Sequence, residues 1–205
     1  TFLPAGAEGY KAPENKIMHM RYAQRVKEAQ TLLTSAGYTP SHPLIFTLMY
    51  NTSDSHKKLA LAIAGMWSQA FSGAVQVKLE NQEWKTFLDT RQQGHYQMAR
   101  DGWLAGADPS AYMDILMSNN PQNNSHWKNK QYDKLISTAD RELNPEKRAT
   151  LYQQAQEVLL NDMPVIPLYQ YSQATLAKPW IGGVKLSPPT GFIYTQDLYI
   201  KAHKA

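Results

Sequence analysis

The 205-residue sequence predicts an α/β fold, and three features support this prediction. A short apolar run over 43–50 is followed by a helix-capping turn, a helical pattern and a second short run over 75–79. Turn-forming residues at 51–54 and 106–109 come after predicted strands. With 42% hydrophobic residues, the chain can bury one good core or a core with a small appendage.

The amino-terminal part predicts a loop and then a helix. Residues 1–15 contain glycines and prolines but few branched apolar side chains, so we expect an extended loop. Apolar residues then recur at roughly helical spacing and stop before Gly37, a residue type that commonly follows a helix end. We therefore expect a helix over 20–35.

The segment from 43 to 79 predicts a β-α-β unit. The run 43–50 begins with proline, and the residues 51–54 offer turn and N-cap oxygens for the following helix. Val75, Val77 and Leu79 alternate as in a half-buried strand. A β-α-β unit normally has parallel strands, and such sheets place ligands beyond the carboxyl ends of their strands. The turn at 50–56 is therefore a candidate binding rim.

The next segment predicts a helix at 83–91 and a strand over 96–103 that ends in the turn 106–109. This turn is a second candidate rim. A helix is expected over 132–141, and another begins at 144–146, where the residues Asn-Pro-Glu supply a cap, an N1 proline and a first-turn acid.

The composition disfavours several classes of function. The net charge is +4, but no basic run is longer than Lys57-Lys58, which disfavours nucleic-acid binding. The chain has no cysteine and no pair of histidines at metal-ligand spacing, so no metal or cofactor is predicted. No stretch approaches the ~18 uninterrupted apolar residues of a membrane span, and the glycine-rich motifs of nucleotide sites and the nucleophile elbow of acyl-transfer enzymes are absent.

Two alternatives to ligand binding stay open. Asp101, Asp108 and Asp114 cluster in the sequence and could serve a hydrolase, which would require two carboxyl groups facing one cleft with perturbed pKa values. A protein-docking or signalling module would instead have an exposed apolar patch without cations that face a carboxylate.

Several motifs resemble one known family in the same order. They are Tyr50-Asn51-Thr52-Ser53-Asp54-Ser55-His56-Lys57-Lys58, the run 81–91, Ala99-Arg100-x-Gly102-Trp103, the region 159–169, and Lys178-Pro179-Trp180-x-Gly182-Gly183. The sequence resembles the periplasmic oligopeptide-binding proteins of Gram-negative bacteria, the OppA-like and murein-peptide-binding receptors of ABC importers (solute-binding protein family 5). The resemblance covers nearly the whole chain, but only the carboxy-terminal portion of these longer proteins.

The resemblance implies an α/β lobe of the periplasmic-binding-protein type II fold, a mixed sheet flanked by helices, over 1–164. Residues 165–205 would form a crossover and return segment of the other lobe. The signal peptide and most of the first lobe would lie outside the chain. The surface between the lobes would then be exposed, which leaves self-association open.

The resemblance also implies which residues contact a ligand. Arg100 and His56 match positions that neutralise a peptide carboxylate, and a fixed guanidinium suits a carboxylate. Trp103 would supply an aromatic wall. The family usually has an aspartate for the peptide's ammonium group where this chain has Gly106, and Asp108 is a candidate substitute.

The implied function is that of the soluble substrate-binding component of an ABC peptide importer and not of an enzyme. It would bind short peptides in the periplasm and deliver them to a membrane permease.

Overall fold

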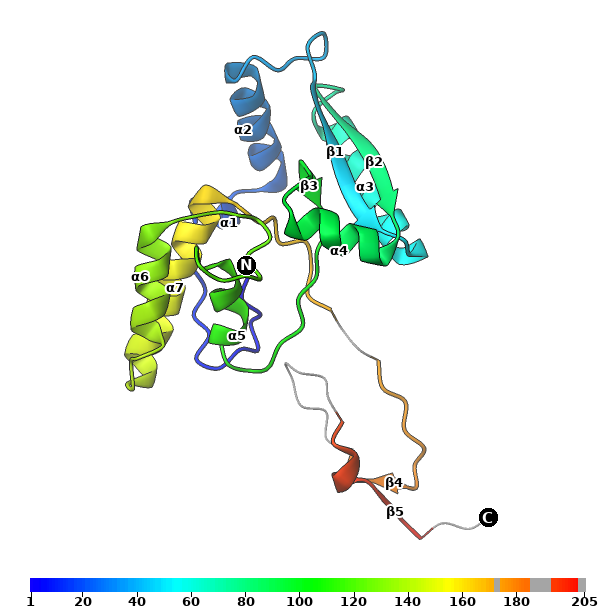
Figure 1. Ribbon diagram of the computed structural model, residues 1–205, viewed down its shortest axis with the longest axis vertical. Coiled ribbons are helices and arrows are strands. Elements are labelled where there is room, and N and C mark those ends of the chain that lie inside the picture. The colour runs from blue at the N-terminus through cyan, green and yellow to red at the C-terminus, as the bar shows by residue number, and fades with distance from the viewer. Residues whose placement is uncertain (172–173, 185–192, 203–205) are drawn as a thin grey trace. The chain divides into compact units, whose positions relative to one another are not determined.

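The computed structural model describes residues 1–171, 174–184 and 193–202, and it separates into two compact units (Figure 1). The first, which we call the sheet unit, comprises 15–102 and 124–126. The second, which we call the helical unit, comprises 1–14, 103–123 and 127–205. The two units are described separately below.

The sheet unit holds most of the elements predicted for the first half of the chain. In chain order it contains α1 (Lys16–His19), α2 (Tyr22–Ser35), β1 (Leu44–Asn51), α3 (Asp54–Ala70), β2 (Val75–Gln82), α4 (Trp84–Gln92) and β3 (Met98–Ala99). The helices predicted at 20–35 and 83–91 and the strand predicted at 43–50 are thus confirmed to within about two residues.

The three strands form a parallel sheet in the order β2-β1-β3, with β1 in the centre (Figure 1). The register of β1 and β2 runs from Leu44 opposite Val75 to Asn51 opposite Gln82. This confirms the predicted β-α-β unit with parallel strands. Its core forms between the sheet and α3, whose apolar face packs on β1, and the buried members of this core are Leu48, Tyr50, Ala60 and Ile63.

The strand predicted over 96–103 is much shorter than expected, since only Met98–Ala99 is a strand. On both sides of β3, side-chain oxygens accept hydrogen bonds from backbone N–H groups. Before β3, the Gln97 side chain accepts the N–H of Thr47 at 2.9 Å. After β3, the carboxylate of Asp101 accepts the N–H of Gly102 at 2.7 Å. These bonds end the ladder, so a run with a strand-like sequence continues as irregular chain.

The helical unit is organised around two helices that lie side by side (Figure 1). Its elements are α5 (Ser110–Met113), the 3-10 helix η1 (Asp114–Leu116), α6 (Lys130–Ala139), α7 (Pro145–Asp162), β4 (Ile181–Gly182), the 3-10 helix η2 (Thr195–Asp197) and β5 (Tyr199–Ile200). The helix predicted at 132–141 corresponds to α6. The core includes Leu3, Tyr112, Met113, Leu116, Tyr132, Ile136, Tyr152, Ala155 and Leu159.

Helix α7 begins as its sequence predicts. The Asn144 side chain accepts the N–H of Lys147 at 3.0 Å, which caps the helix directly before Pro145 at its first position. At the other end Met163 has a left-handed backbone with φ of 49°, and Pro164 follows.

Residues 1–14 form a loop, as predicted, but this loop is part of the core. Leu3 is 1% exposed and lies in the same cluster as the side chains of α6 and α7. The N–H of Glu8 donates to the carbonyl of Ala107 at 2.9 Å, and Lys11 donates to Thr150 at 3.1 Å. The loop over 1–14 therefore contributes a buried side chain that its local sequence pattern does not indicate.

After α7 the chain carries only short elements within its described part. β4 and β5 pair antiparallel, with Ile181 opposite Ile200. Residues 172–173, 185–192 and 203–205 lie outside the described residues. The expectation that 165–205 belongs to another lobe stays a prediction.

The buried hydroxyl of Tyr132 provides a test of the helical unit. It is 0% exposed and donates to the carbonyl of Met113 at 2.6 Å. Tyr132→Phe would leave this carbonyl without its donor and should lower the free energy of unfolding by about 1–2 kcal/mol. Tyr22→Phe, at a position that is 69% exposed, is the control and should change it little. Urea unfolding measures both, and equal effects of the two changes would contradict the prediction.

Candidate ligand-binding site

Arg100 and His56 lie at the same edge of the sheet. Arg100 is the first residue after β3, and its backbone N–H donates to the carbonyl of Met49 in β1 at 2.8 Å. His56 lies in the first turn of α3, which follows β1. Because parallel strands end at one edge, the pairing of β1 with β3 brings the guanidinium and the imidazole to the same edge.

The pKa of His56 is lowered from its ordinary value of 6.5. Burial is the largest cause and the positive charge of Arg100 is the second, while a hydrogen bond with the backbone of Asn51 acts in the opposite direction. Arg100 is therefore within electrostatic reach of the imidazole. At neutral pH the imidazole is mostly uncharged, and the positive charge of the pair is carried by Arg100.

Asp101 follows Arg100 but forms an ion pair with Arg91 of α4. The Arg91 guanidinium also lies over the ring of Phe87, 5.6 Å from its centroid, and Phe87 is buried. Helix α4 therefore holds the carboxylate of Asp101 and fixes the chain directly after Arg100.

In the helical unit, hydrogen bonds anchor the loop that begins at Trp103. The indole N–H of Trp103 donates to the carbonyl of Ala111 at 2.7 Å, and the hydroxyl of Tyr112 donates to the carbonyl of Ala105 at 3.1 Å. The Trp103 side chain is nevertheless 39% exposed, and the neighbouring Leu104 is 77% exposed. The loop thus presents an aromatic and an aliphatic side chain from a fixed backbone.

Asp108 forms a two-armed ion pair with Arg148 of α7. Its two oxygens accept from the guanidinium at 2.8 and 2.9 Å, and one oxygen also accepts the N–H of Ser110 at 2.8 Å. The hydrogen bond from Arg148 is the largest cause that lowers the pKa of Asp108 to about 2. Gly106 is exposed, and a β-carbon added there would meet no atom within 4 Å.

Asp114 has the opposite environment. Burial, followed by the negative charges of Asp140 and Asp108, raises its pKa to about 6. A raised pKa suits a general acid, as the hydrolase alternative requires. The hydrolase alternative also requires a second carboxylate that acts as a general base. Both oxygens of the neighbouring Asp108 accept hydrogen bonds from Arg148, so Asp108 is poorly placed to take a proton from a substrate.

Two further polar residues stand at the ends of β1 and β2. Asn51 is 8% exposed, and in the parallel register it lies opposite Gln82. Sequence reasoning assigned Asn51 only to a turn and gave Gln82 no role. The available signal was structural: once the two strands are paired in register, their last residues must be neighbours at the candidate rim.

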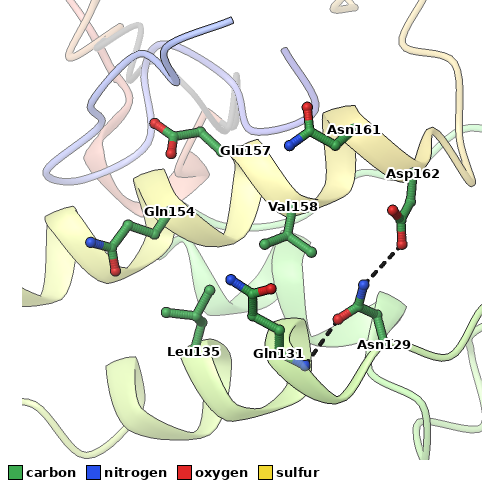
Figure 2. Close-up of a pocket in the computed structure, with 8 residues that line it drawn as sticks. All are labelled: Asn129, Gln131, Leu135, Gln154, Glu157, Val158, Asn161 and Asp162. Atoms are coloured by element: carbon green, nitrogen blue, oxygen red, sulfur yellow. Dashed lines mark hydrogen bonds between the residues drawn. The ribbon is translucent and has the colours of Figure 1, made fainter.

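A separate hollow of about 490 Å³ lies between α6 and α7 (Figure 2). Figure 2 shows Asn129 at one end of it, where its side chain donates to Asp162 at 2.8 Å and accepts the N–H of Gln131 at 2.9 Å. None of the five predicted ligand contacts lines this hollow. Its polar side chains are therefore outside the candidate site at the sheet edge.

Within the described ranges, no three His, Asp or Glu side chains are grouped so as to hold a metal ion. In the same part of the chain, no helix is long and apolar enough to cross a membrane.

The parallel sheet, with Arg100 and His56 beyond the ends of two of its strands, has the arrangement in which α/β proteins commonly bind ligands. Residues 1–124 match the model of a family described as bacterial extracellular solute-binding proteins, family 5 middle region. The chain belongs to this family, whose members are solute-binding proteins and not enzymes.

Curated relatives match almost the full chain. The periplasmic oligopeptide-binding protein OppA of Salmonella typhimurium is 41% identical over 204 residues, which are 99% of this chain and 37% of the relative. The probable deoxycholate-binding periplasmic protein YgiS of Escherichia coli is 40% identical over 204 residues, or 99% of this chain and 38% of the relative. The predicted resemblance to the OppA-like receptors is thus confirmed.

Solved structures are equally similar. The unliganded open form of the murein tripeptide binding protein MppA gives a TM-score of 0.86 at 36% identity, over 98% of this chain and 39% of that one. OppA of Haemophilus influenzae in complex with RPPGFSPFR gives 0.85 at 36% identity, over 98% and 40%. These likenesses confirm the predicted periplasmic-binding-protein type II fold. The chain spans between 37% and 40% of the length of these four proteins.

Asp114 yields a prediction on pH dependence. Its pKa is about 6 in the folded chain and 3.8 without the fold, so the stability it contributes is present below pH 3.8 and is lost as the pH rises through about 6. Asp114→Asn removes the buried charge and should raise the free energy of unfolding at pH 8 by about 1 kcal/mol, a value reduced for partial solvent exposure, with a smaller effect at pH 4.

Denaturant unfolding at both pH values measures this change. Asp89→Asn, at an exposed position of α4, is the matched control and should have a similar small effect at either pH. An effect of Asp114→Asn that is the same at pH 4 and pH 8 would show that the charge of Asp114 is not the cause.

Proposed function

We propose that this chain is the carboxy-terminal, ligand-contacting part of a periplasmic receptor that binds short peptides for an ABC importer. The membrane permease of that importer is the proposed protein partner. The named activities of OppA and MppA, two relatives that match 98–99% of the chain, support this proposal.

The observation that carries the proposal is the pair of Arg100 and His56 at the carboxyl edge of the sheet. A guanidinium and an imidazole that face one edge suit the carboxylate at the end of a peptide, because charged hydrogen bonds to a carboxylate are among the stronger ones in proteins. A protein-docking module, the alternative reading, requires an apolar patch without such cations.

Trp103 is proposed as a wall for an apolar part of the ligand. Its indole N–H is already bonded to Ala111, so the exposed part of the ring can contact a ligand without leaving a buried donor unsatisfied. Leu104 extends this apolar surface.

The carboxylate proposed for the ammonium end of the peptide is already paired within the chain. Asp108 remains the predicted contact, but any ammonium group must compete with Arg148 for its carboxylate. Gly106 offers no side chain. Recognition should therefore depend more on the ligand's carboxylate than on its ammonium group.

This charge distribution favours a second candidate ligand, an amphipathic carboxylate without an ammonium group. The relative YgiS, which is 40% identical, is named as a probable deoxycholate-binding protein. A steroid carboxylate would use Arg100 but would have no need for Asp108.

The role of Arg100 can be tested by calorimetric titration with tri- to pentapeptides and with deoxycholate. Arg100→Ala should weaken binding by about 10- to 100-fold, as expected for the loss of a charged hydrogen bond. Arg25→Ala, at an exposed position of α2, is the control and should bind as the unchanged chain does. Peptides amidated at the carboxyl end should bind as weakly to the unchanged chain as free peptides bind to Arg100→Ala. Undiminished binding of amidated peptides would reject the carboxylate assignment.

The role of position 106 can be tested by adding a carboxylate. The space around Gly106 is open and its backbone does not require glycine, so Gly106→Asp should fold normally. Peptides with a free amino end should then bind about 5- to 10-fold more tightly than acetylated ones, whereas the unchanged chain should distinguish them less. The same titration measures this preference. An equal response of Gly106→Asp to both peptides would mean that the site does not hold the ammonium end near residue 106.

A further inference from the structure

The last residues of β1 and β2 form a pair of amide side chains at the edge that carries Arg100 and His56. Asn51 and Gln82 are register partners in the parallel ladder, so their side chains leave the sheet on the same side and the strands are about 4.8 Å apart. The N–H of Thr52 donates to the carbonyl of Gln82 at 2.8 Å, which fixes the two strand ends together. The backbone of Asn51 also contacts His56.

Both amide oxygens are buried and lack a hydrogen-bond donor within the described part of the chain. These atoms are Oδ1 of Asn51 and Oε1 of Gln82. The orientation of Gln82 is fixed, because its Nε2 donates to the carboxylate of Glu80 at 2.7 Å and its oxygen must therefore point elsewhere. A buried acceptor left without a donor destabilises the folded chain, so buried polar atoms usually have a partner.

Several other amide oxygens of the described residues have donors, although Oε1 of Gln156, within α7 of the helical unit, has none. Gln97 accepts the N–H of Thr47, Asn129 accepts those of Gln131 and Tyr132, and Asn144 accepts that of Lys147. The pair at the strand ends differs from these in having no backbone N–H to serve. The donor for this pair is therefore expected from outside the chain.

The neighbouring charges restrict what that donor can be. At the Asn51 end an ammonium donor would approach a fixed positive charge, because Arg100 lies close enough to His56 to affect its titration and His56 lies against Asn51. At the Gln82 end the Glu80 carboxylate already accepts a hydrogen bond from Nε2 of Gln82. A neutral N–H does not meet this repulsion. The main-chain amide of a peptide is such a donor, and in the last residue of a peptide it lies one carbon away from the carboxylate.

We propose that Asn51 and Gln82 form a subsite that accepts main-chain N–H groups of the ligand next to its carboxylate. The subsite rests on the proposed function, in which Arg100 and His56 hold that carboxylate. It fixes the direction of the ligand, with the carboxyl end at the sheet edge, and it selects peptides over carboxylates that have no N–H group, the second candidate ligand included. Neither Asn51 nor Gln82 was assigned a ligand contact from the sequence.

Two small probes separate the carboxylate from the N–H group. N-acetylglycine carries both, whereas acetoxyacetate has the same shape with an ester oxygen in place of the N–H. The 205-residue chain, labelled with ¹⁵N, is titrated with each probe while the side-chain signals of Asn51, Gln82, Arg100 and His56 are followed by NMR. Both probes should shift the signals of Arg100 and His56. Only N-acetylglycine should shift those of Asn51 and Gln82, and it should bind about three- to tenfold more tightly.

The two groups of signals report on different claims. If Arg100 and His56 respond but Asn51 and Gln82 respond to neither probe, or equally to both, the subsite is rejected and the proposed function stands. If Arg100 and His56 respond to neither probe, the proposed carboxylate site is rejected, and the signals of Asn51 and Gln82 alone decide the subsite.

Substitutions provide a second, independent measurement. Asn51→Leu and Gln82→Met remove the acceptors with little change in volume and should make the chain bind the two probes equally. Gln76→Met, at an exposed position on β2, is the matched control and should keep the preference for N-acetylglycine. If Asn51→Leu does not fold, Gln82→Met decides, because Gln82 is only partly buried. A preference that persists in folded Gln82→Met overturns the contribution of Gln82.

Discussion

The parallel pairing of β1 with both of its neighbours is the constraint on which the candidate site depends. Because β1 runs parallel to β2 and to β3, all three strands end at one edge of the sheet. The residues at and just beyond the strand ends therefore gather there, although Asn51, Gln82 and Arg100 are far apart in the sequence. The pairing in turn depends on α3, whose apolar face packs on β1 through Ala60 and Ile63 and forms the crossover that parallel strands need.

Sequence patterns predicted the elements whose signals are local. The cap and first-position proline at Asn144 and Pro145 place the start of α7, and the alternation after Val75 places β2, because each signal involves residues within one turn or one strand. The pattern over 96–103 failed for a non-local reason. The Gln97 side chain takes a hydrogen bond from Thr47, fifty residues earlier, and no local pattern indicates that. The burial of Leu3 was missed for the same reason, since its partners lie in helices more than a hundred residues away.

The candidate site shows the same limit more sharply. Arg100 and His56 were identified through a family resemblance, and their neighbourhood then follows from strand pairing. The ion pair between Asp108 and Arg148 could not be predicted, because forty residues separate the partners and neither has a distinctive local pattern. That pair changes the chemistry expected of the loop. Asp108, which the sequence predicted as a ligand contact, is already bonded to Arg148 of α7. The pairing of Asn51 with Gln82 likewise requires the register of two strands, which the sequence alone leaves open by one or more residues.

The partial exposure of Arg100 and His56 limits how strongly this chain alone can bind a charged ligand. Arg100 and His56 are only partly buried in this chain, and an ion pair that stays in contact with water contributes about 0–1 kcal/mol. The same pair becomes stronger when a second surface excludes water, because the effective dielectric constant around it falls. The relatives are more than twice as long as this chain, so they have further protein that can supply such a surface. The residues at the sheet edge would then determine which chemical groups are recognised and in which direction, whereas the affinity would depend on how completely the site is covered. Hydrogen bonds to Asn51 and Gln82 depend less on that cover than the charge of Arg100 does, because their oxygens are already buried within the chain.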